Sequence, residues 1–254
     1  RTSFRVAAIV VLVTAVVVTA IVRKSPAEMG QTPLTNEGPS QEAGGKKAPD
    51  SSFGIMKKDA VKTGAFWLFM VAAVCCGMLA AGIMTQVPTY LMETVGDYAV
   101  AMSIYNAVGI LSKPILGVLY DKLGLTKGVW VNALLGCAAM VLLLLVPSAA
   151  TMALAAAVLL SFGTGVGTLA PPLIAGRLFG NKDYGAIYGL VNFGFMGGCM
   201  VGPMLSSTIR TISGSYVSAW IVYIVIFAVM AFFAMVALKA GDALREKASQ
   251  TPTA

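Results

Sequence analysis

The stretch from Lys113 to Gly124 reads Lys-Pro-Ile-Leu-Gly-Val-Leu-Tyr-Asp-Lys-Leu-Gly. It closes one long apolar segment of the 254-residue chain and leads through a short charged turn into the next. Lys113 lies within the apolar part, and an Asp121-Lys122 pair lies at its edge. Because a charge inside a bilayer is costly, it usually serves a function there. The stretch therefore indicates a membrane helix that carries a functional cation.

The composition of the whole chain supports membrane insertion. It is 57% hydrophobic and 11% charged, whereas soluble domains carry about 25% charged residues. A helix needs roughly 20 apolar residues to cross a bilayer, and isolated strands would leave backbone groups unpaired in lipid. We therefore predict an all-α polytopic membrane protein. Its seven spans are 4–22, 64–91, 98–119, 128–147, 152–174, 184–209 and 215–238.

The basic residues that make the net charge +7 gather in alternate connections between these spans. Lys and Arg favour the cytoplasmic side of a membrane. We therefore expect the linker 24–63, the Asp121 turn, the loop at Arg177 and the C-terminus to be cytoplasmic, in a cell (plasma) membrane. The basic groups form no single patch, which argues against a nucleic-acid partner.

Cysteine and histidine usage argues against metal chemistry. The four cysteines lie within spans, none forms a spaced Cys-x-x-Cys pair, and the chain has no histidine. Zinc sites usually need those ligands. No nucleophile-base pair is apparent either. We therefore expect no metal, no cofactor and no enzymatic activity, and interpret the cysteines as packing residues.

The six later spans carry signs of internal symmetry and close packing. Asp97 opens the third span and Asp183 the sixth, each as an expected N-cap, on opposite sides of the membrane. This repeated position of Asp favours two three-helix units of opposite orientation, a 3+3 inverted repeat. Glycines spaced four apart indicate faces where helix backbones approach closely. These are Gly163 and Gly167 in the fifth span, and Gly194, Gly198 and Gly202 in the sixth.

Prolines and aromatic residues suggest local features of the spans. Pro171-Pro172 interrupts the fifth span, as a packing kink or as a bend that lines a cavity. Six aromatic residues near span ends are expected to form interfacial belts. They are Trp67, Tyr90, Tyr98, Trp130, Tyr216 and Trp220.

Lys113 is the strongest candidate for a binding residue. It precedes Tyr120 by seven positions, which places it roughly 10 Å inside the end of its helix. Its side chain either snorkels to the interface or faces a water-filled cavity and attracts an anion. No Asp or Glu lies in the middle of any span. The counter-ion that a buried cation needs is thus a substrate anion or a carboxylate from elsewhere.

Asp121 lies at the expected cytoplasmic edge. It is either an ordinary solvated loop residue or a gate contact. In the second role its carboxylate would pair with a cation or a facing helix N-terminus and so stabilise one conformation.

The chain resembles the major facilitator superfamily at these residues. Gly117, Asp121, Lys122 and Gly124 match the loop signature that follows the second helix of each six-helix half, whereas Leu125 and Thr126 depart from its basic positions. The resemblance implies twelve helices in two halves joined by a cytoplasmic loop. Residues 1–23 would be helix six of a truncated N-terminal half, 24–63 a disordered linker, 64–240 the C-terminal six-helix bundle and 241–254 a cytoplasmic tail.

Within that superfamily, Lys113 to Gly117 is similar to the corresponding stretch of oxalate/formate antiporters and monocarboxylate transporters. Those families usually carry an arginine at the Lys113 position, and it contacts the substrate carboxylate. Phe179 to Gly189 also resembles the oxalate/formate group, but Asn192 and its neighbours supply no second cation. The resemblance therefore implies a monocarboxylate rather than a dianion.

We hypothesise a secondary transporter of a small organic anion, acting by alternating access as a proton symporter or an anion antiporter. Lys113 would bind the anion, Asn192 and Tyr105 would line the cavity, and Asp121 would bias the gate. Its other partners would be the lipid bilayer and the N-terminal half. Two alternatives remain open: an exporter of a larger amphipathic compound or a sugar, and a membrane sensor or scaffold without transport.

Overall fold

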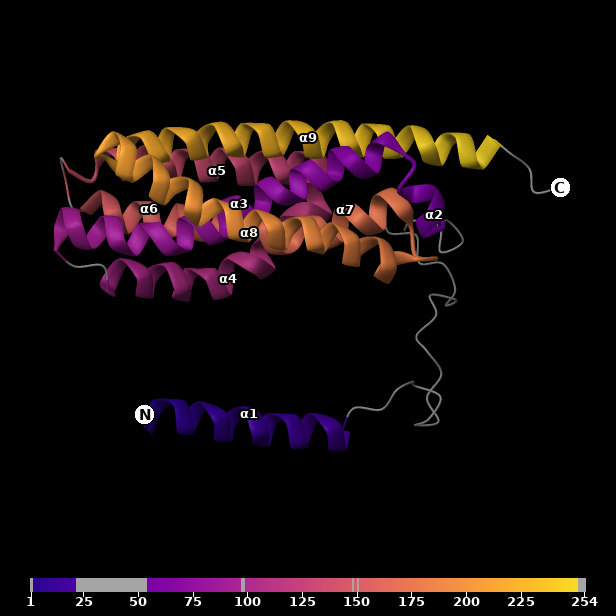
Figure 1. Ribbon diagram of the computed structural model, residues 1–254. Helices are drawn as coiled ribbons and strands as arrows, with labels where there is room; N and C mark the ends of the chain where they lie inside the picture. The colour runs from indigo at the N-terminus through magenta and orange to yellow at the C-terminus, as the bar shows by residue number, and fades with distance from the viewer. Residues whose placement is uncertain (1, 22–53, 97–98, 148, 150, 251–254) are drawn as a thin grey trace. The chain divides into compact units, whose positions relative to one another are not determined.

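The computed structural model describes residues 2–21, 54–96, 99–147, 149 and 151–250 (Figure 1). The chain divides into two compact units, Arg1–Lys47 and Ala48–Ala254. The first unit contains helix α1, Thr2–Ile21, which matches the predicted span 4–22. The described side chains of its second half are exposed and most of them are apolar, as expected for a helix that faces lipid.

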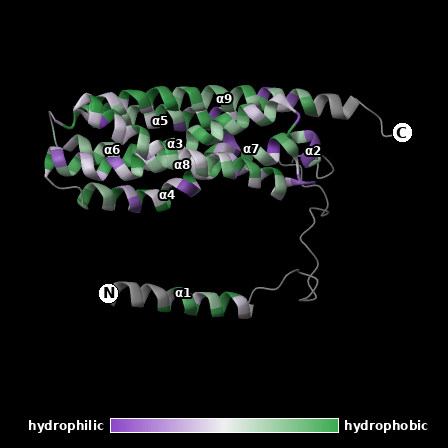
Figure 2. Cartoon of the chain, viewed as in Figure 1, coloured by the Kyte–Doolittle hydropathy of each residue, from purple (hydrophilic) through white to green (hydrophobic). Residues whose placement is uncertain are grey.

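The second unit is a bundle of long helices. After the short helix α2, Lys57–Ala60, it contains α3 (Gly64–Val95), α4 (Ala99–Leu123), α5 (Leu125–Leu145), α6 (Thr151–Gly163), α7 (Val166–Phe179), α8 (Tyr184–Ser213) and α9 (Tyr216–Gln250). Among the described residues, 6 segments are long and apolar enough to cross a membrane, with α6 and α7 counted together. Hydrophobic residues follow these helices along most of their length (Figure 2). The six predicted spans of this unit are thus confirmed.

The helices pack as expected of two three-helix units in which each unit places its first helix against the other unit. The first helix of one unit, α3, packs mainly on α8 and α9, the second and third helices of the other. Likewise α6 packs mainly on α4 and α5. This reciprocal arrangement agrees with half of a major facilitator fold built from 3+3 repeats.

Glycine brings α3 and α8 into backbone contact. A Cβ atom added at Gly198 would meet the backbone of Val74, and one added at Gly77 would meet the backbone of Phe195. A Cβ atom at Gly202 would likewise meet the backbone of Met78. The predicted glycine face of the sixth span is therefore the surface on which α3 packs.

The fifth span is broken, but not at the prolines. α6 ends at Gly163 and α7 begins at Val166, while Pro171 and Pro172 lie inside α7. Two physical causes favour the break here. Glycine is a poor helix former, and Gly163 lies directly against the backbone of Gly136 in α5. The predicted site of interruption was therefore wrong by about two turns.

The end of the predicted disordered linker is folded. Residues 22–53 lie outside the described part of the chain, but α2 forms at 57–60. The backbone N–H of Ile55 donates to the Phe179 carbonyl over 2.9 Å. The Asp183 carboxylate accepts from the Lys57 backbone N–H over 2.9 Å instead of capping its own helix. Asp183 therefore connects the end of the linker to the start of α8 through a hydrogen bond. Asp97, the other predicted cap, is not described.

The predicted tail boundary also falls within a helix, because α9 continues past residue 240 to Gln250. Gly241 packs on Leu178. Arg177 pairs with Asp242, with 3.2 Å between Nη2 and Oδ2. These contacts hold the end of α9 against α7.

Three of the expected belt aromatics are core residues instead. Tyr90, Tyr216 and Trp220 are at most 6% exposed and contact one another through their rings. The Tyr90 hydroxyl donates to the Leu143 carbonyl over 2.7 Å. Trp67 and Trp130 are exposed, as an interfacial belt requires.

We predict that Gly198→Ala destabilises the bundle by about 1–3 kcal/mol, because the added methyl group forces α3 and α8 apart. The measurement is the thermal unfolding midpoint of the purified protein in detergent.

The matched control is Gly197→Ala. Gly197 is the preceding residue of the same helix, and a Cβ atom there would meet nothing within 4 Å. Equal midpoints for the two variants would contradict the proposed backbone contact.

Candidate functional site

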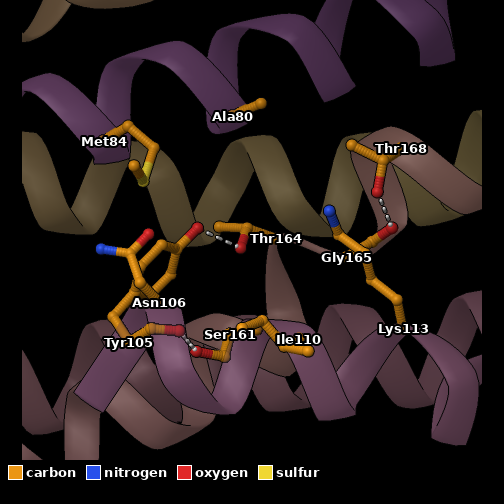
Figure 3. Close-up of a pocket in the computed structure, with 11 residues that line it drawn as sticks. Ala80, Met84, Tyr105, Asn106, Ile110, Lys113, Ser161, Thr164, Gly165 and Thr168 are labelled. Carbon is orange, nitrogen blue, oxygen red and sulfur yellow. Dashed lines mark hydrogen bonds between the residues drawn. The ribbon is translucent and has the colours of Figure 1, made fainter. Parts of the chain in front are cut away.

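A cavity of about 720 Å³ lies beside the break between α6 and α7. Its wall comes from α3, α4, α6, the break and the start of α7 (Figure 3). The lining residues are Ala80, Met84, Tyr105, Asn106, Gly109, Ile110, Lys113, Ser161, Thr164, Gly165 and Thr168. We call this the first cavity.

Lys113 carries the charge of the first cavity, because every other lining residue is uncharged. It lies on the same face of α4 as Asn106 and Ile110, which precede it by seven and three positions. Figure 3 places Lys113 with Gly165 at one end of the cavity and Tyr105 with Met84 at the other. Lys113 therefore lies in the lining of the first cavity and is exposed.

Tyr105 reaches the broken helix through a hydrogen-bonded pair. Its hydroxyl lies 2.9 Å from the Thr164 hydroxyl, and Thr164 donates to the Leu160 carbonyl over 2.7 Å. Since a hydroxyl has one hydrogen, both bonds form together only if Tyr105 donates to Thr164. Ser161 in turn donates to the Tyr105 carbonyl over 2.6 Å. Together these bonds tie α4 to the helix break.

Asn192 does not share the cavity of Lys113. It lines a second cavity, of about 210 Å³, between α7 and α8. The lining residues of this second cavity are Gly167, Thr168, Pro171, Tyr188, Val191, Asn192 and Phe195. Thr168 lines both cavities. The start of α7 therefore separates the two predicted lining residues, Tyr105 and Asn192.

Buried side chains bind the carbonyls at the helix break. Ser112 donates to the Ser161 carbonyl over 3.1 Å, and Asn132 donates to the Phe162 carbonyl over 2.7 Å. Both donors are fully buried. Tyr120 donates to Asn132 Oδ1 over 2.9 Å. A chain of hydrogen bonds thus runs from the residue before Asp121 to the end of α6 at the helix break.

The signature stretch forms the tight corner between α4 and α5. Gly124 is the only residue between the two helices, with φ of 81°, a conformation that favours glycine. Gly117 is half-buried, whereas Asp121 and Lys122 are exposed. Neither charged side chain forms an ion pair within the described residues. The structure therefore explains Gly124 and leaves the gating role of Asp121 as a hypothesis.

The opposite end of the bundle carries an ion pair that sequence reasoning missed. Arg210 of α8 lies 3.0 Å from Glu93 of α3, measured from Nη2 to Oε2. The Arg210 guanidinium also stacks over the Tyr216 ring at 5.0 Å and donates to the Gly214 carbonyl. These contacts tie together the ends of α3, α8 and α9.

Sequence reasoning also missed several polar residues of the first cavity, among them Asn106, Thr164 and Thr168. Each is a polar residue within an apolar span, which is the signal that could have indicated them. The described residues contain no group of His, Cys, Asp or Glu suited to hold a metal ion.

A helical membrane bundle with a cavity beside a broken helix has the architecture of a membrane transporter. The Major Facilitator Superfamily model matches residues 94–253, which is more than half of the chain. The protein therefore belongs to the major facilitator superfamily, whose members are typically transporters rather than enzymes. No curated protein matches the chain.

We predict that Tyr120→Phe lowers the free energy of unfolding by about 0.5–1.5 kcal/mol, because Asn132 Oδ1 loses its donor in the core. The measurement is the thermal midpoint in detergent.

The matched control is Tyr188→Phe, since the half-buried Tyr188 hydroxyl has no hydrogen bond within the described residues. A larger loss of stability in Tyr188→Phe than in Tyr120→Phe would argue against the hydrogen-bond chain.

Proposed function

We propose that the protein is a secondary active transporter of a small organic anion, most simply a monocarboxylate. The observation that carries this proposal is the position of Lys113, the one charged residue in the lining of the first cavity. The Lys113 ammonium attracts a counter-charge; within the described residues it forms no ion pair, and no Asp or Glu lines either cavity. A substrate carboxylate supplies that charge.

Hydrogen bonding adds to this attraction. The Tyr105 and Thr164 hydroxyls, the Asn106 amide and the Thr168 hydroxyl surround the same space. A pocket with one cation and several neutral polar groups suits a singly charged ligand better than a dianion. Asn192, in the second cavity, would contact substrate only when the start of α7 moves.

Transport would proceed by alternating access. The faces of α4 and α8 are the least buried of the six spans and carry exposed apolar residues such as Ile110 and Phe193. We propose that a second six-helix bundle packs there. Rocking between the two bundles would move the cavity from one side to the other. The exchanged species would be a second anion or a proton, and Asp121 would bias the gate.

The basic connections favour a plasma membrane orientation with residues 24–63 and the C-terminus in the cytoplasm. We predict that Lys127→Cys reacts with a membrane-impermeant maleimide only from the cytoplasmic side. Ser213→Cys, at the far end of α8, reacts only from outside. Labelling of intact cells and of inverted vesicles measures this. The reverse pattern would overturn the orientation.

We predict that Lys113→Gln lowers uptake at least 10-fold, because the carboxylate loses its counter-charge. Lys113→Arg keeps the charge and retains partial uptake. The measurement is uptake of labelled lactate and gluconate by cells that express the full-length protein.

The matched control is Lys127→Gln, which removes an exposed lysine outside both cavities. Equal uptake by Lys113→Gln and the control, at equal amounts in the membrane, would exclude the binding role of Lys113.

A second candidate is export of a larger amphipathic compound or a sugar. The volume of the first cavity and its apolar side, formed by Ala80, Met84 and Ile110, favour this alternative. It requires that flux of a neutral compound persists in Lys113→Gln. A sensor or scaffold would bind ligand without any flux in proteoliposomes.

A further inference from the structure

Proline occurs inside four of the helices that surround the cavities, and in three of them it follows a cavity-lining residue by four positions. Because it has no amide hydrogen, the carbonyl four residues earlier loses its α-helical donor. The prolines in question are Pro88 in α3, Pro114 in α4, and Pro171 and Pro172 in α7.

The carbonyls that lose a donor belong to Met84, Ile110, Gly167 and Thr168. All four residues line a cavity, three of them the first. No side chain among the described residues donates to any of these carbonyls. Pro203 in α8 differs, because the carbonyl it frees belongs to Cys199, which lines neither cavity.

Hydroxyl oxygens in the lining of the first cavity can also accept hydrogen bonds. Thr168 donates its hydrogen to the Gly165 carbonyl over 3.2 Å, and Thr164 donates to the Leu160 carbonyl. Tyr105 donates to Thr164 in the arrangement that forms both bonds. Each hydroxyl oxygen keeps a lone pair. Apart from Lys113, the spare side-chain donor is one N–H of Asn106, whose other N–H binds the Met102 carbonyl.

The first cavity thus combines one cation with a wall rich in hydrogen-bond acceptors. A plain aliphatic acid would pair with the cation but offers no donors to the acceptors. A ligand with a carboxylate and several hydroxyl groups satisfies both. Lys113 and Tyr105 are eight residues apart on α4, roughly 12 Å along the axis, so an extended ligand reaches both.

We propose that the substrate is an extended polyhydroxylated monocarboxylate. Its carboxylate pairs with Lys113, and its hydroxyl groups donate to Tyr105, Thr168 and the carbonyls freed by proline. This rests on the proposed function, since it takes Lys113 as the anion-binding residue.

Binding of three probes to the purified full-length protein tests the proposal by isothermal titration calorimetry. Gluconate has the carboxylate and the hydroxyl groups, hexanoate has the same chain length without hydroxyl groups, and sorbitol has hydroxyl groups without charge. We expect gluconate to bind at least 10-fold more tightly than either of the others. Lys113→Gln should reduce gluconate affinity to that of sorbitol.

Variants of the acceptor wall sharpen the test. Tyr105→Phe and Pro114→Ala should each weaken gluconate binding on the order of 3- to 10-fold, the second because a new N–H occupies the Ile110 carbonyl. Neither should change hexanoate binding. The matched control Pro203→Ala should leave the affinity for gluconate unchanged.

Two failures are distinguishable. If hexanoate binds as tightly as gluconate and depends on Lys113, the acceptor wall does not select substrate, while the proposed transport of a monocarboxylate stands. If neither carboxylate binds, or neither depends on Lys113, the proposed function fails and the polyhydroxylated ligand fails with it.

Discussion

Hydrocarbon offers no partner to a backbone N–H or C=O, so every such group within a bilayer must find one inside the protein. An unbroken α-helix meets this demand by itself. The cavities lie where the regular α-helical pattern is interrupted, at the break between α6 and α7 and beside prolines inside helices. At the break, Ser112 and Asn132 supply donors from α4 and α5. Those two bonds hold an irregular backbone within a helical bundle.

Charged side chains, like backbone polar groups, need partners within the protein. At each end of the bundle, an exposed ion pair links helices that are distant in sequence, Arg177 with Asp242 and Arg210 with Glu93. Such pairs stabilise little individually, about 0–1 kcal/mol, but they connect helices within the second unit. Lys113 has no such partner within the described residues. It is therefore available to an anion in the cavity.

Much of the fold could be predicted because hydropathy and length are properties of local sequence. The six spans of the second unit agree with prediction, and so does the packing face at Gly198 and Gly202. Predictions from sequence were wrong where tertiary contacts determine the surroundings of a side chain. Tyr90, Tyr216 and Trp220 look like interfacial residues in sequence, but they pack on one another in the core. Asp183 looks like a cap of its own helix, but it binds the linker end through Lys57.

The sequence by itself determined that the chain is a helical membrane protein and that Lys113 lies inside a span. These follow from the cost of exposing polar groups and charges to lipid. Only the tertiary structure decided which polar groups share a cavity. It placed Thr164 and Thr168 in the same cavity as Lys113 and left Asn192 across α7. The physical reason is that the helix breaks where Gly163 meets Gly136, a contact between α6 and α5 that neither segment specifies alone.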